Sequence, residues 1–536
     1  MATGAFLPNH APAQVLEGAT LASLPAPRLV FSSDEMALAQ AVATNPGLAD
    51  FYGANGLRPV FLGQGGGVLR QALIRSVEQA PSHGLPPRRY AAAHLRALDA
   101  SGATTLADEM AFAQVFQNWT HDIAGGILDP ASLPGNKRQV IRPGTGDMLR
   151  GFVSAPDPGA YLDALAPQDP RYRILQQALA RQGGGVAPPL GLRPVPSGSW
   201  REGDLGPQIA LLRDRLAALG HDAGPAPQLQ LFDAGLTRAV ASFQAAAGLT
   251  ADGIAGPRSI ALMNGGPSAQ SAAILVALER MRWMAGQDPM ARQVWVNLPE
   301  FAAHVLDGGQ EVFSTRVVIG KADPEFETPE FSETMKYVVA NPRWNVPRSI
   351  TVKEYLPKLK ANRNAVSQLD ILDRAGNVIP RDRIDFSRYT AANFPYRMRQ
   401  KPSDDNALGQ VKFLFPNPWN IYLHDTPSKH LFNQASRAYS HGCIRIGRPI
   451  DLAHELLQGQ VGNPEAAFGR ALASGDEAYL NLRHPVPVHL VYFTAFPDRD
   501  GKIRRYPDIY GRDAMVHAAL VKAAEPSGLD FASLSD

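Results

Sequence analysis

Residues 422–446 read YLHDTPSKHLFNQASRAYSHGCIRI, and Cys443 in this stretch is the only cysteine among the 536 residues of the chain. A single thiol excludes an internal disulfide, which leaves a buried apolar residue, a metal ligand or a reactive thiolate. A cysteine that only fills a core normally lies in an apolar run, whereas Cys443 follows Ser440, His441 and Gly442, which suit a turn and a polar site. The neighbours therefore favour a chemical role.

A reactive thiol needs a base, because free cysteine is mostly protonated at neutral pH. His424 ends the strand-like segment NIYLH, and its imidazole can meet Cys443 if that strand lies beside the cysteine loop. Gly442 lets the backbone approach a substrate closely, and the amides of His441, Gly442 and Cys443 are candidate oxyanion donors. Arg445 would project from the same side of an extended chain and could hold a substrate carboxylate.

A metal site is the alternative interpretation of the same residues. The candidate zinc ligands are His424, Asp425, His441 and Cys443. Their spacing matches no usual zinc pattern, since the chain has neither HExxH nor a paired CxxC. We therefore expect no metal.

From residue 292 the apolar pattern alternates with a period of two, which is typical of strands. The strand-like segments are QVWVNLP, AAHVLD, VFSTRVVIG, MKYVVANP, VKFLFPN, NIYLHDT and VPVHLVYFTAF. So many short strands predict a β-sandwich or barrel-like domain. One helix, Ile450–Leu457, is expected directly after the cysteine motif.

A basic segment interrupts this strand series. Lys336–Lys401 has fourteen Lys or Arg against five Asp or Glu, in a chain whose net charge is +2. An insertion of this length in a β domain is typically a lid or binding element, and its charge suits an anionic partner such as a peptide with free carboxylates. We expect it to fold over the cysteine groove, with Trp344 as a candidate wall residue.

The N-terminal half has a helical pattern. Residues 1–28 are rich in Pro and Ala and predict a flexible tail. Residues 34–182 carry apolar side chains at helical spacing, and a Gly/Pro linker, Arg181–Ser199, follows them. Beyond it lies a unit of three predicted helices: Ile209–Leu219, Leu236–Ala246 and a short one after Gly256-Pro257. The next helix, SAAILVALERMRWMAG, is expected to return to the first helical region, so that the unit is an insertion.

The overall composition describes a folded protein with 45% hydrophobic and 19% charged residues. Near-neutral charge and the absence of a recognised motif argue against nucleic acid as a partner. No stretch approaches 18 uninterrupted apolar residues, so no transmembrane segment is expected. The start, MATGAFLPNHAPAQ, lacks an export signal. The protein is therefore expected to be either cytoplasmic or a mature exported form whose signal has been removed.

Residues 422–446 resemble the active-site signature of the L,D-transpeptidases, which have a YkuD-type catalytic domain. In that family a histidine precedes a Ser-His-Gly-Cys motif and an arginine follows it. NPRWNVPRSI, NALGQVKFLFPN and DRDGKIRRYPDIYGRD resemble the large periplasmic, YcbB-like branch, and the resemblance covers about residues 30–515. The three-helix unit resembles a peptidoglycan-binding domain at core and turn positions: Leu212, Leu216, Gly220, Phe232-Asp233, Ala239-Val240, Phe243-Gln244, Gly248-Leu249, Asp252-Gly253 and Gly256.

The resemblance implies a multidomain α+β chain: a helical scaffold domain, an inserted three-helix peptidoglycan-binding domain and a mostly-β, YkuD-like catalytic domain with a capping insertion. The expected boundaries are 1–28 for the tail, 29–199 and 267–290 for the scaffold, 200–266 for the peptidoglycan-binding domain, 291–507 for the catalytic domain with its cap at about 343–405, and 508–536 for a C-terminal tail.

Carried over to this chain, the resemblance makes Cys443 the nucleophile and His424 its base, with His441 and Gly442 shaping the oxyanion site. Substrate binding is expected from Arg445, Ser440, Tyr422, Trp344 and Asp425. The thiolate would attack the third-residue carbonyl of a tetrapeptide stem, release D-alanine and pass the acyl group to an amine of a second stem. This acyl transfer requires no cofactor.

The implied partners are peptidoglycan stem peptides and glycan, with carbapenem β-lactams as covalent inhibitors, and the implied location is the periplasm. Two alternatives stay open. An L,D-carboxypeptidase would resolve the same thioester with water, and a cell-wall-binding protein would carry an inert cysteine.

Overall fold

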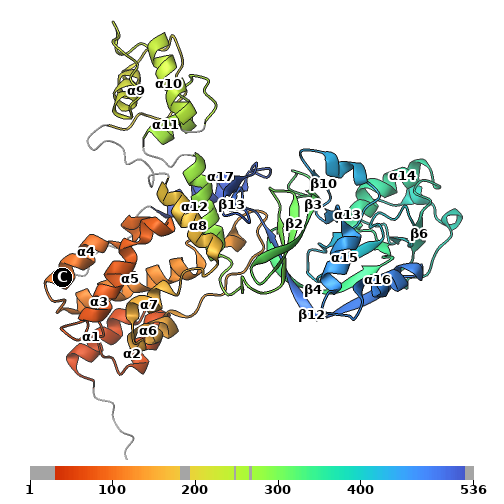
Figure 1. Ribbon diagram of the computed structural model, residues 1–536, viewed down its shortest axis with the longest axis horizontal. Coiled ribbons are helices and arrows are strands. Elements are labelled where there is room, and N and C mark those ends of the chain that lie inside the picture. The colour runs from red at the N-terminus through yellow and green to blue at the C-terminus, as the bar shows by residue number, and fades with distance from the viewer. Residues whose placement is uncertain (1–30, 182–192, 247–248, 265–268, 525–536) are drawn as a thin grey trace, which may run out of the picture.

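The computed structural model describes residues 31–181, 193–246, 249–264 and 269–524. The expected flexible tail, 1–28, lies outside this part of the chain. Figure 1 shows helices gathered at one end of the long axis, strands at the other, and a small helical unit standing apart near α12. No helix in the described chain is both long and apolar enough to cross a bilayer.

The scaffold helices begin where the sequence supplies caps. Ser32 and Glu35 form a capping box before the first helix, and Thr105 and Asp108 form another before the longest one. The helices are α1 (Ser33–Val42), α2 (Pro46–Ala54), α3 (Gly67–Glu78), α4 (Ala92–Ala100), α5 (Leu106–Gly125), α6 (Thr145–Ser154), α7 (Pro158–Asp163), α8 (Pro170–Arg181) and, after the inserted unit, α12 (Ala269–Arg282). The predicted helical scaffold is confirmed.

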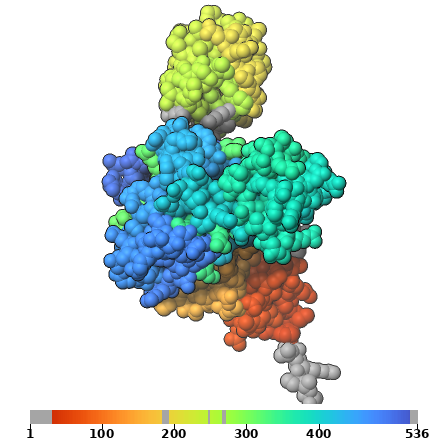
Figure 2. All heavy atoms as spheres, turned by 90° about the vertical axis from the view of Figure 1, so that its right-hand side faces the viewer, coloured from red at the N-terminus to blue at the C-terminus, as the bar shows by residue number. Residues whose placement is uncertain are grey.

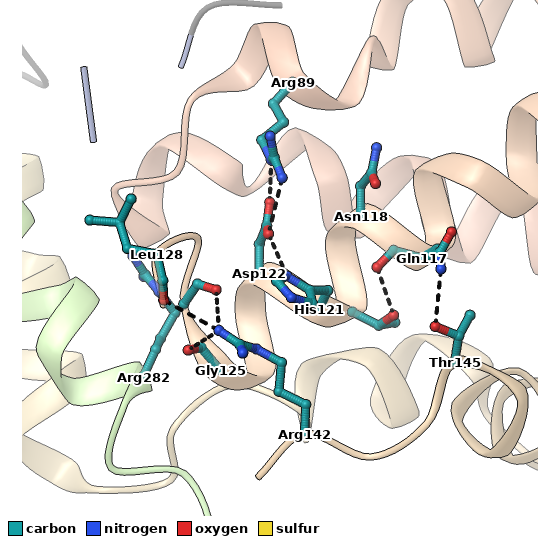
Figure 3. Close-up of polar contacts among 12 residues, drawn as sticks. Arg89, Gln117, Asn118, His121, Asp122, Gly125, Leu128, Arg142, Thr145 and Arg282 are labelled. Atoms are coloured by element: carbon teal, nitrogen blue, oxygen red, sulfur yellow. Dashed lines mark hydrogen bonds and ion pairs between the residues drawn. The ribbon is translucent and has the colours of Figure 1, made fainter. Parts of the chain in front are cut away.

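Helix α5 runs through the middle of this scaffold, and its C-terminus is closed by a single arginine (Figure 3). The Arg142 guanidinium donates to the carbonyl oxygens of Gly125, Gly126 and Leu128 at 2.9, 3.0 and 3.4 Å. The last carbonyls of a helix lack partners within the helix, and a cation there also complements the helix dipole. One turn earlier, the buried carboxylate of Asp122 accepts hydrogen bonds from Arg89.

The small unit contains α9 (Pro207–Ala218), α10 (Ala234–Ala246) and α11 (Pro257–Met263), so its three predicted helices are confirmed. Its core is built from its own residues, such as Leu212, Leu216 and Phe232. That core reaches back to Val195, before the expected boundary at residue 200, because the Asn264 side chain pairs with both backbone groups of Val195 at 2.9 and 2.8 Å.

The strands close into a barrel-like sheet. They are β1 (Gln293–Asn297), β2 (Ala302–Asp307), β3 (Gln310–Gly320), β4 (Phe331–Ala340), β8 (Val411–Leu414), β9 (Leu423–His424), β10 (Ala438–Ser440), β11 (Ile444–Ile446) and β12 (Ala478–Val491). The order is β10-β3-β11-β9-β8-β4-β12-β1-β2, and β2 also pairs with β3, which closes the ring. A hairpin of β13 (Ala495–Pro497) and β14 (Ile503–Arg505) follows, and α15 (Pro449–Leu457) and α16 (Pro464–Ala473) cover the sheet.

Strand β9 is shorter than the expected segment NIYLHDT. The reason is Asn417, whose side-chain oxygen accepts from the N–H groups of Trp419 and Ile421 at 3.2 and 3.1 Å, while its amide donates to the Ile421 carbonyl at 2.7 Å. A side chain that bonds its own backbone in this way holds a turn in place of a strand. Asn420 therefore lies in a loop, with φ of +56°.

The cap is inserted between β4 and β8, which pair directly in the barrel. It has a sheet of its own and a core of its own, around residues such as Leu369, Met398 and Phe394. Its elements are β5 (Trp344–Asn345), α13 (Arg348–Ile350), the π-helical turn η4 (Thr351–Tyr355), α14 (Leu356–Ala361), β6 (Leu369–Leu372) and β7 (Arg397–Gln400). Figure 2 shows this cap in teal, beside the blue C-terminal part of the chain.

The barrel and the scaffold share one core. Tyr172 and Leu175 of α8 and Leu278 of α12 pack with Trp295 of β1 and Phe493 beyond β12. The stretch 508–536, expected only as a tail, contains α17 (Arg512–Ala523). This helix packs on α12 through an ion pair between Arg280 and Asp513 and through buried Val516.

Candidate active site

Strands β9 and β11 pair in parallel, and this pairing brings the segment of His424 beside the segment of Cys443. Leu423 lies opposite Ile444, and the Ile444 N–H donates to the Tyr422 carbonyl at 3.1 Å. Leu423 and Ile444 are fully buried in the barrel core. Because side chains alternate along a strand, Tyr422 and Cys443 lie on the opposite face, side by side.

The same alternation places three charged or titratable groups next to them. His424 pairs in register with Arg445 on one side and with Lys412 of β8 on the other. Residues directly opposite in paired strands share a face of the sheet. One sheet face therefore carries Lys412, His424 and Arg445 together with Tyr422 and Cys443.

Cys443 lies in a cleft of about 1050 Å³. Its walls come from four regions of the chain: the catalytic strands and loops, the cap, the scaffold segment 134–137 and the C-terminal region. The lining residues are Pro134, Gly135, Lys137, Pro324, Glu325, Glu327, Pro329, Asn345, Pro347, Arg348, Ser349, Lys412, Trp419, Asn420, Ile421, Tyr422, His441, Gly442, Cys443, Tyr510 and Met515. The cleft is thus shared by several regions of the chain that lie far apart in the sequence.

The surroundings of the Cys443 thiol disfavour the thiolate. Burial raises the pKa of Cys443, while a hydrogen bond from the Tyr422 backbone and the positive charge of Lys412 act against that shift. The thiol donates weakly to the Asn420 carbonyl at 3.6 Å. Only a neighbouring base or a bound substrate can therefore favour the thiolate at neutral pH.

His424 is a neutral imidazole. Burial, followed by the charge of Arg445, lowers the pKa of His424 to about 3, and only 5% of the residue is exposed. Its Nδ1 contacts the Asp425 carbonyl, which fixes Nδ1 as the protonated nitrogen and leaves Nε2 as the acceptor. Between the described residues, no hydrogen bond joins this imidazole to the Cys443 sulfur.

Tyr422 links the two groups. Its ring lies 5.7 Å from the His424 ring, measured between centroids, and the Lys412 ammonium lies 3.8 Å from the Tyr422 ring centroid. Burial and the neighbouring Cys443 raise the pKa of Tyr422 well above its usual value, and the Trp344 indole acts against that shift. Trp344 of the cap therefore reaches the site through Tyr422.

The polar groups of the loop before Cys443 form hydrogen bonds with one another. The Ser440 hydroxyl accepts from the Gly442 N–H at 3.1 Å and donates to the Cys443 carbonyl at 2.5 Å, and Ser440 is buried. Gly442 has φ of +108°, in the left-handed region that favours glycine. The Gly442 amide, expected as an oxyanion donor, is therefore already engaged inside the loop.

His441 faces the cap. Its Nε2 lies 2.7 Å from Glu354 Oε1 on the π-helical turn, and its ring meets the edge of Phe326 at 4.9 Å. The adjacent Lys353 pairs with Glu325 of the loop after β3. A histidine–carboxylate contact and a lysine–carboxylate ion pair thus join the cap to the rim of the cleft.

Asp425 and Arg445 do not line the cleft in the described chain. The Asp425 carboxylate accepts from the N–H groups of Gln410 and Thr426 at 2.9 and 2.6 Å and pairs with Lys429. Arg445 is half-buried beside His424. Among the residues expected to bind substrate, Tyr422 lines the cleft, Trp344 adjoins it, and Ser440, Asp425 and Arg445 support its floor.

The geometry gives no support to a zinc site. His441 and Asp425 are engaged by Glu354 and Lys429, and the described residues contain no group of three or more His, Cys, Asp or Glu arranged to hold a metal. The sequence interpretation missed Lys412. Its alternation with buried Val411 and Phe413 in VKFL was visible, but its pairing with His424 depends on the sheet register.

Three parts of the chain match known protein families. Residues 291–464 match the "L,D-transpeptidase catalytic domain", residues 46–179 match the "Scaffold domain", and residues 206–263 match the "Putative peptidoglycan binding domain". The resemblance stated from the sequence is therefore confirmed.

One curated relative is a "Putative L,D-transpeptidase" of Haemophilus influenzae, 37% identical over 228 residues. The match covers 42% of this chain and 45% of the relative, so the chain spans about half the length of that protein. Solved structures of L,D-transpeptidases from Xylanimonas cellulosilytica and Stackebrandtia nassauensis are 15% and 14% identical. They cover 56% and 55% of this chain and 100% and 96% of their own, with TM-scores of 0.15 and 0.17, which are too low to support any argument.

Proposed function

Because the chain carries an L,D-transpeptidase catalytic domain at residues 291–464, we propose that it is a peptidoglycan L,D-transpeptidase with Cys443 as its nucleophile. One observation carries the proposal: the only thiol lies in a large cleft, on the same sheet face as a buried, neutral imidazole. Such a pair suits covalent acyl transfer, in which the base activates a nucleophile that is otherwise inert.

In the first half-reaction, His424 Nε2 accepts the thiol proton as the Cys443 sulfur bonds to the third-residue carbonyl of a donor stem. The carbonyl oxygen becomes an oxyanion, and the N–H of Cys443 itself, which has no hydrogen-bond partner in the described chain, is its backbone donor. The intermediate then collapses, the bond to D-alanine breaks, and the imidazolium returns its proton to the leaving amine. A thioester remains.

In the second half-reaction, an amine of an acceptor stem attacks the thioester. His424 takes a proton from that amine, the carbon–sulfur bond breaks, and the thiol is restored as the cross-link forms. Transpeptidation requires the donor and acceptor stems to lie beside Cys443 together. A cleft lined by several regions of the chain supports this outcome, because different walls can contact the two stems. Water in place of the amine would make the protein an L,D-carboxypeptidase.

The charges around the sulfur support the first step. Lys412 and Arg445 both lower the pKa of Cys443, against the effect of burial. Neither forms an ion pair within the described residues; the Glu477 carboxylate and Cys443 both stabilise the charge of Lys412, and Cys443 stabilises that of Arg445. A carbapenem β-lactam would acylate the same sulfur by the same attack, and peptidoglycan as substrate implies a periplasmic location.

Incubation with purified disaccharide-tetrapeptide, followed by mass spectrometry, tests the proposal. A dimer that lacks one D-alanine establishes transpeptidation, whereas free tripeptide alone establishes hydrolysis. Cys443→Ala should abolish both products while the fold is retained. His424→Ala should slow acylation by about 10²- to 10⁴-fold. Unchanged substrate with the wild-type protein would contradict transpeptidase and carboxypeptidase alike.

A further inference from the structure

Thr328 is a buried residue that joins the end of β3 to the loop of the nucleophile. Its hydroxyl accepts from the Gly320 N–H at 2.9 Å and donates to the Gly442 carbonyl at 2.8 Å. Thr328 is fully buried, so no solvent competes for either bond. Loss of the hydroxyl would leave a buried donor and a buried acceptor unpaired.

The peptide group held by Thr328 is the one between Gly442 and Cys443. The described chain contains no cis peptide, and in a trans peptide the carbonyl and the N–H point in opposite directions. A carbonyl bound by Thr328 therefore directs the Cys443 N–H away from Thr328. The other polar group of Gly442, its N–H, is held by Ser440.

The backbone of Thr328 is also anchored, by residues of the C-terminal region. Arg512 donates to the Thr328 carbonyl at 2.9 Å, and the Thr328 N–H lies 3.4 Å from the Tyr510 hydroxyl oxygen. Arg512 also pairs with Glu327 and Glu330 at 2.9 and 3.3 Å, and it is 2% exposed. The threonine hydroxyl is thus held at a fixed place relative to the barrel.

The scaffold reaches the same loop. The backbone groups of Glu330 pair with the Gly135 carbonyl and the Lys137 N–H, both at 2.8 Å. Gly135 has φ of +72°, and a side-chain carbon there would lie 2.4 Å from the Arg512 guanidinium. The scaffold segment, Arg512 and the loop 327–330 therefore fit together closely.

We propose that Thr328 is a positioning residue that orients the Cys443 N–H toward the oxyanion of the acyl-transfer step. The inference rests on the proposed role of Cys443 as nucleophile. It also gives the scaffold and the C-terminal helix a part in the reaction, since both hold the loop that carries Thr328.

The test compares two reactions of the same sulfur in the full-length protein. p-Nitrophenyl acetate acylates a cysteine through a tetrahedral oxyanion, whereas iodoacetamide alkylates it by displacement without one. Thr328→Val removes the hydroxyl and nearly keeps the shape, and Thr328→Ser keeps the hydroxyl as a matched control. We expect Thr328→Val to lower the acylation rate by about 10- to 100-fold. Its alkylation rate should stay within about threefold of wild type, and Thr328→Ser should acylate at nearly the wild-type rate.

Several outcomes would overturn the proposal. Acylation by Thr328→Val at the wild-type rate would contradict it, as would equal losses in the valine and serine variants. Equal losses of acylation and alkylation would assign Thr328 a purely structural role. If the valine variant does not fold, Thr328→Ala takes its place in the same comparison.

The proposed function fails separately. A wild-type protein that the ester acylates at Cys443 but that leaves muropeptides unchanged would contradict the transpeptidase proposal alone. A wild-type Cys443 that p-nitrophenyl acetate does not acylate would contradict both proposals.

Discussion

Two helical regions of the chain differ in how they relate to the barrel. The scaffold shares a core with the barrel, in which α8 and α12 pack on Trp295 and Phe493. The three-helix unit has a core built only from its own residues and stands apart from the rest in both views (Figures 1 and 2). A shared core couples the stability of two regions, whereas separate cores unfold separately.

Buried polar contacts strengthen the scaffold attachment. Arg138 donates to the Ser332 hydroxyl at 2.5 Å and to the Leu490 carbonyl at 3.1 Å, and both partners lie on barrel strands. The scaffold and the barrel therefore form one packed unit, whereas the three-helix unit does not share their core. Four predictions test this difference.

The largest effect is expected from Arg512→Met. This change leaves the buried carboxylate of Glu330 and that of Glu327 without their main cation. Removing one partner of a buried ion pair typically costs about 3–5 kcal/mol, so chemical denaturation should show a loss of that order. Arg504→Met is the control, because Arg504 pairs with Asp498 at the surface, and it should change stability little. Equal stability of the two variants would break the comparison.

The second prediction concerns pH. Burial is the main cause that lowers the pKa of His83 to about 4 and those of His424 and His489 to about 3. These histidines have a pKa of about 6.5 in the unfolded chain, so below that pH they bind protons when the chain is unfolded but stay neutral when it is folded. Stability should therefore fall with pH below about 6.5, by up to about 1.4 kcal/mol per pH unit for each histidine.

His304 has the opposite effect on stability, at higher pH. Burial alone would lower its pKa, but hydrogen bonds with Glu300 and Glu311 raise it to about 9. The stability that it contributes is complete below about pH 6.5 and is lost as the pH rises through 9. The melting temperature, measured from pH 4 to 9, should therefore be highest near pH 6.5. A curve that is flat between pH 4 and 6.5 would contradict the buried neutral histidines.

A smaller effect is expected from Lys137→Glu on the scaffold wall of the cleft. Lys137 is exposed, and its side chain has no ion pair in the described chain, while its backbone is fixed on Glu330. If a stem-peptide carboxylate binds there, KM for disaccharide-tetrapeptide should rise about fivefold, the equivalent of about 1 kcal/mol. Lys137→Arg should restore binding, and Lys502→Glu, away from the cleft, serves as the charge control. An unchanged KM would show that this part of the scaffold does not contribute to substrate binding.

The smallest effect on catalysis is expected when residues 195–264 are deleted. The deletion begins at Val195 because that residue belongs to the core of the three-helix unit. Turnover of small soluble muropeptides should stay within about twofold of wild type, since separate cores are not coupled. Retention on insoluble peptidoglycan should weaken, as measured by co-sedimentation. Unchanged retention would make the unit a spacer.

Much of the architecture could be predicted from local patterns. The helix at residues 106–125 follows from a capping box and from apolar spacing, and the helix at residues 207–218 follows from a proline in its first turn and from apolar spacing. These signals all act within a few residues. The alternating segments predicted strands for the same reason. The motif around Cys443 predicted a nucleophile and a base, and the structure brings Cys443 and His424 onto one face of paired strands.

Other features depend on register between distant segments. The amide of Gly442 and the side chains of Ser440 and Asp425 looked available for substrate, yet each is engaged by a partner inside the protein. Lys412 and Thr328 carry no local signal that assigns them to the site. They reach it because β8 pairs with β9 and because the loop after β3 folds back on Gly442.

The elements, the family resemblance and the choice of Cys443 as the candidate nucleophile follow from the sequence alone, because periodicity, capping and a compact motif are properties of short segments. Which polar groups face the cleft depends on how the strands pair. A strand alternates its side chains, so one step in register moves each of them to the other face, and the register here depends on pairing between segments far apart in the chain, β9 with β11 and with β8.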